Sequence, residues 1–205
     1  YQEHIERNPG DAEAFNHLGL ARLAKGNPSE AESCFRTAIQ LNQFDPLFHA
    51  NLAQTLAHLD RTDEAGASYE RAIEIDPNDA GFRTQHGWYL LTVGDTVRAE
   101  DRFREALQRA PESEGASAGL AAALERRKEV RVGIQVLRPF ISAVHPHPKV
   151  ATSYATLSQR EYKPEQALPV IRRAIRPGVP RKEEAALRFA EGDLLDAMGE
   201  VDAAF

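Results

Sequence analysis

Small, bulky and polar positions alternate with a helical rhythm along most of the chain. Between residues 12 and 24 the core-type positions follow an i, i+3, i+4, i+7 spacing, held by Phe15, Leu18, Gly19 and Arg22. The polar stretch KGNPSE interrupts this rhythm, and Pro28 suits the first turn of a new helix, where its missing N–H costs nothing. One face of that second helix would hold Ala31, Phe35, Ala38 and Ile39. The pattern predicts a helix, a short turn and a second helix.

The same pattern returns every 34 residues. One series of small residues consists of Gly19, Ala53, Gly87, Ala121 and Ala155. A second, mostly Ala, consists of Ala31, Ala65, Ala99, Gly133 and Ala167. A bulky series consists of Phe35, Tyr69, Phe103, Leu137 and Ile171, and Tyr1 falls in phase with it. One supersecondary unit stacked about five times accounts for all three series.

Small residues in fixed phase also predict how the two helices pack. Gly19 and Ala31 would lie where the helices cross, so that the backbones approach closely, and Phe35 would fill space towards the following unit. Between units, Pro77 would end one helix and Asp79 would cap the next.

These features resemble the tetratricopeptide repeat (TPR), a 34-residue helix-turn-helix unit. The first-helix signature of that family is matched by Phe15, Leu18 and Gly19, and again by His49, Leu52, Ala53 and Leu56. Its second-helix signature is matched by Ala31, Phe35 and Ala38, by Ala65, Tyr69 and Ala72, and by Ala99, Phe103 and Ala106. Its closing proline is matched by Pro9, Pro77 and Pro111. The resemblance implies an all-α fold, an α-solenoid of stacked antiparallel units that forms a right-handed superhelix.

The repeat phase predicts the organisation of the chain. Residues 1–11 would be the second-helix end of a preceding repeat, so we expect a fragment of a longer protein. The units that follow would span 12–45, 46–79, 80–113, a degenerate 114–147, a degenerate 148–184, and a partial unit at 185–205. In the fifth unit Pro169 would kink or shorten the second helix.

In TPR proteins the first helices line a concave groove that binds ligands, and the resemblance carries that role onto specific positions. They are Glu13, Asn16, His17 and Leu20 in the first unit, Leu47, Asn51, Gln54 and His58 in the second, and Gln85, Trp88 and Thr92 in the third. The expected function is a scaffold that binds a peptide or protein segment in this groove.

Three of these positions form a row. His17, Asn51 and Gln85 lie 34 residues apart, and each side chain can donate and accept hydrogen bonds. Such a row could hold the backbone of an extended peptide, as an Asn row does in the similar TPR domain of O-linked N-acetylglucosamine transferases. The alternative is a solvated groove. Trp88, the only Trp, could anchor a ligand side chain or pack within the helices.

A second device of the family is not matched. Chaperone-binding TPRs form a carboxylate clamp of Lys, Arg and Asn, and the corresponding positions here hold Asn16, Leu20, Asn51, Gly81 and Gln85. Only Asn51 fits and both cations are missing. We therefore expect no recognition of a C-terminal Glu-Glu-Val-Asp type peptide.

Two other functions stay open. The chain could be the substrate-docking arm of an enzyme of sulfotransferase or glycosyltransferase type whose catalytic domain lies elsewhere. In support, the last stretch resembles the final unit of bacterial TPR-sulfotransferases at Phe189, Ala190, Gly192 and Asp196. It could instead be an assembly module that associates with itself through its repeat ends, because open solenoid ends need caps.

Composition narrows the choice of partners. The chain has 25 Lys and Arg against 31 Asp and Glu, a net charge of −6, which argues against general nucleic-acid binding. No apolar run is long enough for a membrane span, and no secretory signal is present, so we expect a cytoplasmic location. The lone Cys34 excludes an internal disulfide. No catalytic constellation is evident, and His145-Pro146-His147 is a loop rather than a metal motif, so we expect no metal and no cofactor.

Overall fold

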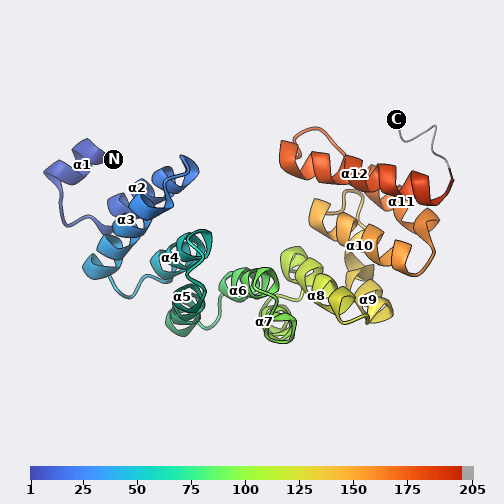
Figure 1. Ribbon diagram of the computed structural model, residues 1–205, viewed down its shortest axis with the longest axis horizontal. Helices are drawn as coiled ribbons and strands as arrows, with labels where there is room; N and C mark the ends of the chain where they lie inside the picture. The colour runs from blue at the N-terminus through green and yellow to red at the C-terminus, as the bar shows by residue number, and fades with distance from the viewer. Residues whose placement is uncertain (200–205) are drawn as a thin grey trace. The chain divides into compact units, whose positions relative to one another are not determined.

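The structure is a computed structural model that describes residues 1–199, and over these residues it consists of helices joined by short turns (Figure 1). The part of the sixth predicted unit at 200–205 lies outside the described residues. The helices are α1 Gln2–Arg7, α2 Ala12–Ala24, α3 Pro28–Leu41, α4 Pro46–His58, α5 Thr62–Ile75, α6 Ala80–Thr92, α7 Thr96–Arg109, α8 Glu114–Arg126, α9 Val130–Ile141, α10 Pro148–Arg160, α11 Pro164–Ala174 and α12 Arg181–Ala197. The predicted all-α repeat fold is confirmed.

The helices fall into two compact units, Tyr1–Val93 and Gly94–Phe205, which we call unit 1 and unit 2. In unit 1, α2 packs against α3 and α4 against α5, and α3 also contacts α4. In unit 2, α8 packs against α9 and α10 against α11, while α10 contacts both neighbouring hairpins. Within each unit, successive hairpins therefore bury apolar faces against one another, as expected for a repeat protein.

The start of each first helix is set by the same capping position. In α2, α4, α6, α8 and α10 the N-cap side chain accepts a hydrogen bond from the backbone of the first turn, and the caps are Asp11, Asp45, Asp79, Ser113 and His147. These residues lie 34 apart, and each satisfies one of the N–H groups that a helix start leaves without a partner. The predicted cap at Asp79 is confirmed. The last helix, α12, lacks such a cap and begins at Arg181, ahead of the predicted start of the sixth unit at 185.

The turn inside each hairpin has its own repeating feature. One residue per turn adopts the left-handed conformation with φ between 58° and 89°, and the series is Gly26, Asp60, Gly94, Lys128 and Tyr162. Glycine takes this conformation without cost, whereas a residue with a Cβ is strained there by about 1–2 kcal/mol. Two members of the series, Lys128 and Tyr162, therefore hold bulky side chains at a position that favours glycine.

Buried aromatic rings pack against glycines of the first helices. Phe35 and Phe103 are wholly buried, and a Cβ added to Gly19 would lie 2.7 Å from the Phe35 ring. A Cβ on Gly119 would likewise overlap the Phe103 ring. Phe103 thus reaches the following hairpin, whereas Phe35, for which that placement was predicted, lies against Gly19 of its own hairpin. The crossing residues Ala31 and Ala65, with no exposed surface, allow the close approach.

Proline positions also affect the helices as expected. α11 contains Pro169 and spans 11 residues, while α3, α5 and α7 span 14 each. Proline removes a helical hydrogen bond and crowds the preceding turn, which explains the shorter helix. α9, with 12 residues, contains an interior Pro139 that sequence analysis did not single out.

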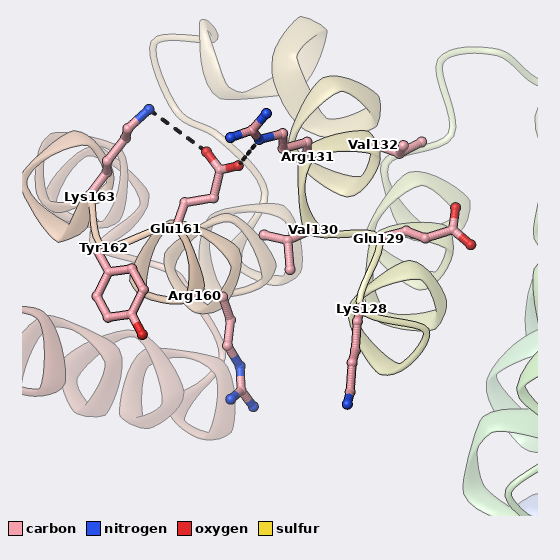
Figure 2. Close-up of a pocket in the computed structure, with 9 residues that line it drawn as sticks. All are labelled: Lys128, Glu129, Val130, Arg131, Val132, Arg160, Glu161, Tyr162 and Lys163. Atoms are coloured by element: carbon pink, nitrogen blue, oxygen red, sulfur yellow. Dashed lines mark hydrogen bonds and ion pairs between the residues drawn. The ribbon is translucent and has the colours of Figure 1, made fainter.

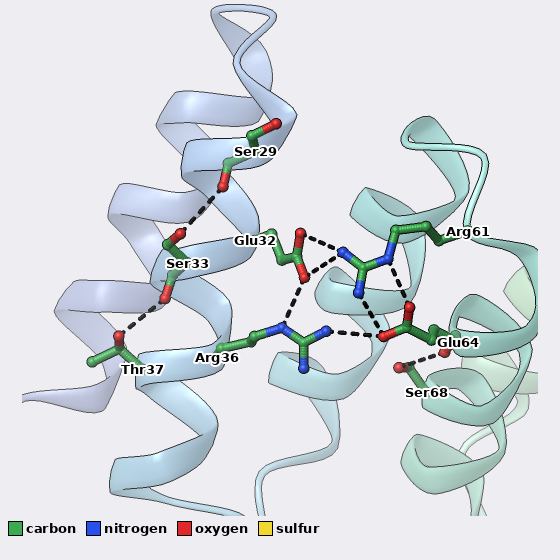
Figure 3. A network of polar contacts seen from close by, with 8 residues as sticks. All are labelled: Ser29, Glu32, Ser33, Arg36, Thr37, Arg61, Glu64 and Ser68. Atoms are coloured by element: carbon green, nitrogen blue, oxygen red, sulfur yellow. Dashed lines mark hydrogen bonds and ion pairs between the residues drawn. The ribbon is translucent and has the colours of Figure 1, made fainter.

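An ion-pair network joins the first two hairpins of unit 1 (Figure 3). Arg61, at the start of α5, donates to Glu32 of α3 at 2.7 Å and to Glu64 at 2.6 Å, and Arg36 of α3 also pairs with both carboxylates. Partial burial raises the pKa of Glu32, but the hydrogen bonds from Arg36 and Arg61 outweigh it and lower the pKa overall. The network holds the second helix of one hairpin to the turn of the next.

A similar network occurs in unit 2 around Glu100, whose side chain is 8% exposed. Its two carboxylate oxygens accept from Arg104 Nη2 at 2.7 Å and from Arg127 Nη1 at 2.6 Å. Burial raises the pKa of Glu100, and the hydrogen bonds from the two guanidiniums lower it by more, so it lies below its ordinary value. Arg127 follows α8, so this cluster again joins successive hairpins.

Two Gly→Ala substitutions test the packing of rings on glycines. Gly119→Ala should lower the free energy of unfolding by about 1–3 kcal/mol, because the new methyl overlaps the buried Phe103 ring. Gly66→Ala is the matched control, since Gly66 lies in α5 with no atom within 4 Å of an added Cβ. That substitution should raise stability by about 0.5–1 kcal/mol, the helix preference for Ala. Urea unfolding followed by circular dichroism measures both, and stabilisation by Gly119→Ala would contradict the packing described.

A pH series tests the Glu100 cluster. Glu100→Gln should lower the free energy of unfolding by about 1–3 kcal/mol at neutral pH, because it removes a nearly buried charge with two guanidinium partners. A carboxyl group whose pKa is lowered by folding stabilises the protein above its unfolded-state pKa, about 4.3, and this contribution is lost as the pH falls through the folded-state value. The difference between wild type and Glu100→Gln should therefore shrink under acid conditions.

The control for this series is Glu112→Gln, at an exposed position of the same unit. It should have little effect at any pH, because exposed charges contribute little to stability. A Glu100→Gln effect that stays constant from neutral to acid pH would show that the lost charge is not its cause.

Candidate functional site

The candidate ligand positions of unit 1 lie on α2, α4 and α6, and we call this surface the first-helix face. Six of the nine predicted site residues are exposed, namely Glu13, His17, Leu20, Gln54, His58 and Gln85. Leu47 and Thr92, two further predicted groove positions, are also exposed. Asn51 and Trp88 are half-buried. Because α2, α4 and α6 begin 34 residues apart, His17, Asn51 and Gln85 occupy the same place on successive first helices.

Asn16 differs from the rest of the predicted set because it is 8% exposed. Its Oδ1 accepts a hydrogen bond from Asn51 Nδ2 at 2.8 Å, between α2 and α4. This bond fixes the Asn51 amide with its Oδ1 left to accept a further hydrogen bond. Asn16 is therefore placed to orient Asn51 rather than to touch a ligand.

His17 has an aromatic neighbour that the sequence analysis did not predict. Its ring stacks on Tyr1, with the ring centroids 5.4 Å apart and the planes inclined by 25°. Tyr1 thus lies against the following first helix, as Phe103 does, which agrees with its phase in the bulky series. One face of the imidazole is covered, and the ring remains exposed at its edge.

Gln85 and Trp88 lie on α6, which also contributes two rings to a buried aromatic cluster. In this cluster His86, with no exposed surface, stacks on Tyr69 with the ring centroids 5.4 Å apart, and Tyr89 packs beside both. The Tyr89 hydroxyl donates to the Thr62 carbonyl at 2.6 Å, and burial raises the pKa of Tyr69 to about 12. Both phenols therefore stay neutral at ordinary pH.

His86 was missed by sequence reasoning. It stands where Leu18 and Leu52 stand in the two preceding units, so the 34-residue alignment itself held the signal. Glu70 of α5 lies beside this ring, with its Oε1 3.6 Å from the His86 Nδ1.

The charge of the first-helix face is acidic to neutral. None of its predicted residues is Lys or Arg, and Glu13 carries the one formal negative charge among them. Residues 1–93 as a whole hold seven Lys and Arg against fourteen Asp and Glu. The predicted positions themselves therefore offer no Lys or Arg to pair with a carboxylate ligand.

Unit 2 has clefts between its own first helices that the sequence did not indicate. A cleft of about 270 Å³ lies between α10 and α12 and is lined by Thr152, Ala155, Thr156, Gln159, Ala186, Phe189, Ala190 and Asp193. A smaller one of about 100 Å³ lies between α8 and α10. Phe189 is 72% exposed. Its place in the C-terminal motif was the one feature of the sequence that pointed to this cleft. Both clefts lie between successive first helices of unit 2.

The remaining candidate chemistry has structural roles. His147 caps α10 through Nδ1, and His145 Nδ1 lies 3.3 Å from the Arg173 carbonyl. Within residues 1–199 no three His, Cys, Asp or Glu side chains are grouped so that they could hold a metal ion. No helix in that range is long and apolar enough to cross a membrane. Cys34 is half-buried, and burial raises the pKa of its thiol.

Helical hairpins that repeat every 34 residues and pack on their neighbours define a class of α-helical repeat proteins. The sequence model of the tetratricopeptide repeat matches residues 1–46, 17–80 and 84–138. These matches cover more than half of the chain, so the chain belongs to the tetratricopeptide repeat family.

Relatives of this chain include longer proteins. The Hsp70-Hsp90 organizing protein of Triticum aestivum is 31% identical over 103 residues, which cover 50% of this chain and 18% of that protein. The small glutamine-rich tetratricopeptide repeat-containing protein of Dictyostelium discoideum is 28% identical over 124 residues, which cover 58% of this chain and 37% of that protein. The chain therefore spans well under half the length of these relatives.

A solved structure described as the functional characterisation of Pseudomonas aeruginosa pilF has the same fold. The two chains superimpose with a TM-score of 0.76 over 97% of this chain and 89% of the other, at 21% identity. At this level of identity the likeness shows the fold alone.

Proposed function

We propose that this chain is a protein-interaction scaffold whose first-helix face in unit 1 binds an extended segment of a partner protein. The observation that carries the proposal is the row formed by His17, Asn51 and Gln85, one residue at the same place on each of three successive first helices. Each can donate and accept hydrogen bonds, as a neutral imidazole or as an amide, and so can pair with the N–H and C=O groups of a peptide backbone.

Specificity would come from side chains beside this row. Leu20 and Leu47 are exposed apolar residues on α2 and α4, and burying them against a ligand is favourable. Trp88 is half-buried on α6. Aromatic residues of this kind are often the residues that contribute most to an interface.

The support beneath the face favours binding without rearrangement. Asn51 is oriented by Asn16, and α6 rests on the packed cluster of Tyr69, His86 and Tyr89. Groups that are already held in place lose little conformational entropy when a ligand binds. Most of the conformational entropy lost on binding would therefore come from the partner segment.

The charge of unit 1 favours a neutral or basic partner segment. With seven cations against fourteen carboxylates, the unit would repel an acidic segment and attract a basic one. The name of the wheat relative says that it organises Hsp70 and Hsp90, which agrees with a scaffold role for the family. As a second hypothesis, the chain would serve as the substrate-docking arm of a larger enzyme of sulfotransferase or glycosyltransferase type. Phe189 of α12, which belongs to the motif that suggests this function, is exposed.

The experiment uses Trp88 as a built-in reporter. Extended peptides that bind the intact chain are first selected by peptide display. They are then titrated into the protein while the fluorescence of the single Trp is measured. The side-chain amide signals of Asn51 and Gln85 are followed by NMR spectroscopy in the same titration. Binding should shift all three signals. Asn51→Ala combined with Gln85→Ala should weaken binding about tenfold, because two hydrogen bonds are lost.

The matched control carries Gln40→Ala and Gln108→Ala, which remove exposed amides from the second helices α3 and α7. It should bind like wild type. If the control loses affinity and the Asn51, Gln85 variant keeps it, the site is on another surface and the proposal fails.

A further inference from the structure

A basic pocket lies on the turn edge of unit 2, away from the first-helix clefts of that unit. It has a volume of about 490 Å³ and is formed by the turn between α8 and α9 together with the turn between α10 and α11. Its lining comprises Lys128, Glu129, Val130, Arg131, Val132, Arg160, Glu161, Tyr162 and Lys163 (Figure 2). We call this the turn-edge pocket. Its volume is within the range of clefts that hold ligands.

The pocket lies in a basic stretch of an acidic protein. Residues 126–163 hold eight Lys and Arg against two Glu, whereas the whole chain has a net charge of −6. The lining itself has four cations and two carboxylates. A local charge of this sign attracts acidic groups even when the protein as a whole is acidic, because screening by salt confines charge effects to about 10 Å.

The two carboxylates of the lining are already occupied. Glu161 accepts from Arg131 Nε at 3.0 Å and lies 3.8 Å from Lys163 Nζ, while Glu129 pairs with Arg127 outside the pocket at 3.1 Å. Figure 2 shows Glu129 turned away from the other lining residues. The ion pairs formed by these two carboxylates join them to Arg127, Arg131 and Lys163, and none includes the Lys128 ammonium. The pocket therefore presents more positive charge than its own acids neutralise.

Three side chains point to one side of the pocket. Figure 2 shows Lys128, Arg160 and the hydroxyl end of Tyr162 directed to the same side, opposite the Arg131–Glu161–Lys163 group. Arg160 is also bound to Glu125 at 3.1 Å, which leaves part of its guanidinium for other acceptors. Tyr162 is 92% exposed, so this side is open to solvent and can accept a chain that runs across it.

Two of the bulky residues that line the pocket, Lys128 and Tyr162, have a strained backbone conformation. Lys128 has φ 65° and Tyr162 has φ 58°, at the turn position where Gly26 and Gly94 stand in other repeats. Strain that persists at a bulky residue is a reason to look for a function of its side chain. Here both strained residues line the same pocket, one with an ammonium and one with an exposed phenol.

We propose that the turn-edge pocket docks an acidic segment of a partner protein, with its carboxylates on Lys128 and Arg160 and its chain packed along Tyr162. The lining is made of long, exposed side chains on two turns, which suits a flexible peptide better than a small enclosed ligand. This site is separate from the first-helix face of unit 1, whose charge favours the opposite kind of partner.

The test measures binding of a defined acidic probe to the intact chain. The probe is a fluorescein-labelled peptide of about twelve residues in which Glu and Gly alternate, followed by fluorescence anisotropy at about 50 mM and about 150 mM salt. A peptide with Gln in place of Glu is the neutral control. We expect the acidic probe alone to bind, more weakly at the higher salt.

Variants then locate the site. Lys128→Gly combined with Arg160→Gln should weaken binding of the acidic probe about tenfold, while Arg188→Gln, which removes an exposed charge from α12 of the same unit, should change it less than about twofold. Lys128→Gly should not lower the melting temperature, because glycine relieves the left-handed strain. The Asn51→Ala, Gln85→Ala variant should bind the acidic probe like wild type, which separates this site from the proposed function.

Several results would overturn the proposal. They are equal binding of the neutral peptide, equal loss of affinity in Arg188→Gln, or failure of the acidic probe to bind at the lower salt. Tighter binding of an oligothymidylate strand, lost in the Lys128, Arg160 variant, would assign the pocket to nucleic acid instead.

Discussion

The close approach of helices at small residues is the constraint on which the rest of this structure depends. Ala31 and Ala65 leave no room for bulk between the helices of a hairpin, and the rings of Phe35 and Phe103 fill the space over Gly19 and Gly119. A ring over a glycine sets both the depth and the rotation of the first helix. Which side chains of that helix face outwards, and so which could meet a ligand, follows from this packing.

Polar contacts add a second level of order between hairpins. The clusters around Glu32 and Glu100 each place a carboxylate of one hairpin between guanidiniums that include one from the next. The Asn16–Asn51 hydrogen bond does the same on the first-helix face. Apolar packing alone tolerates small slips of one hairpin over another, whereas hydrogen-bonded charges with defined directions do not.

Much of the fold could be predicted from the sequence, because the signals that determine it are local and repeat. The 34-residue series gave the helices, Pro28 and Asp79 gave two of their starts, and Pro169 explained a short one. Less of the candidate site could be predicted from the sequence, because the site depends on contacts between repeats. The burial of Asn16, the stacking of His17 on Tyr1 and the joining of Lys128 to Tyr162 in one pocket involve residues that are distant in sequence or out of phase.

The position of the single tryptophan has a consequence for how unfolding of this protein would be observed. Trp88 belongs to unit 1, and each unit is held by contacts among its own hairpins. Tryptophan fluorescence therefore reports the loss of structure around α6, whereas far-ultraviolet circular dichroism reports the helices of both units. In a repeat protein, segments can unfold at different denaturant concentrations. A gap between the two transitions would then measure how independently the units fold, and a single coincident curve would mean that the chain unfolds as one cooperative body.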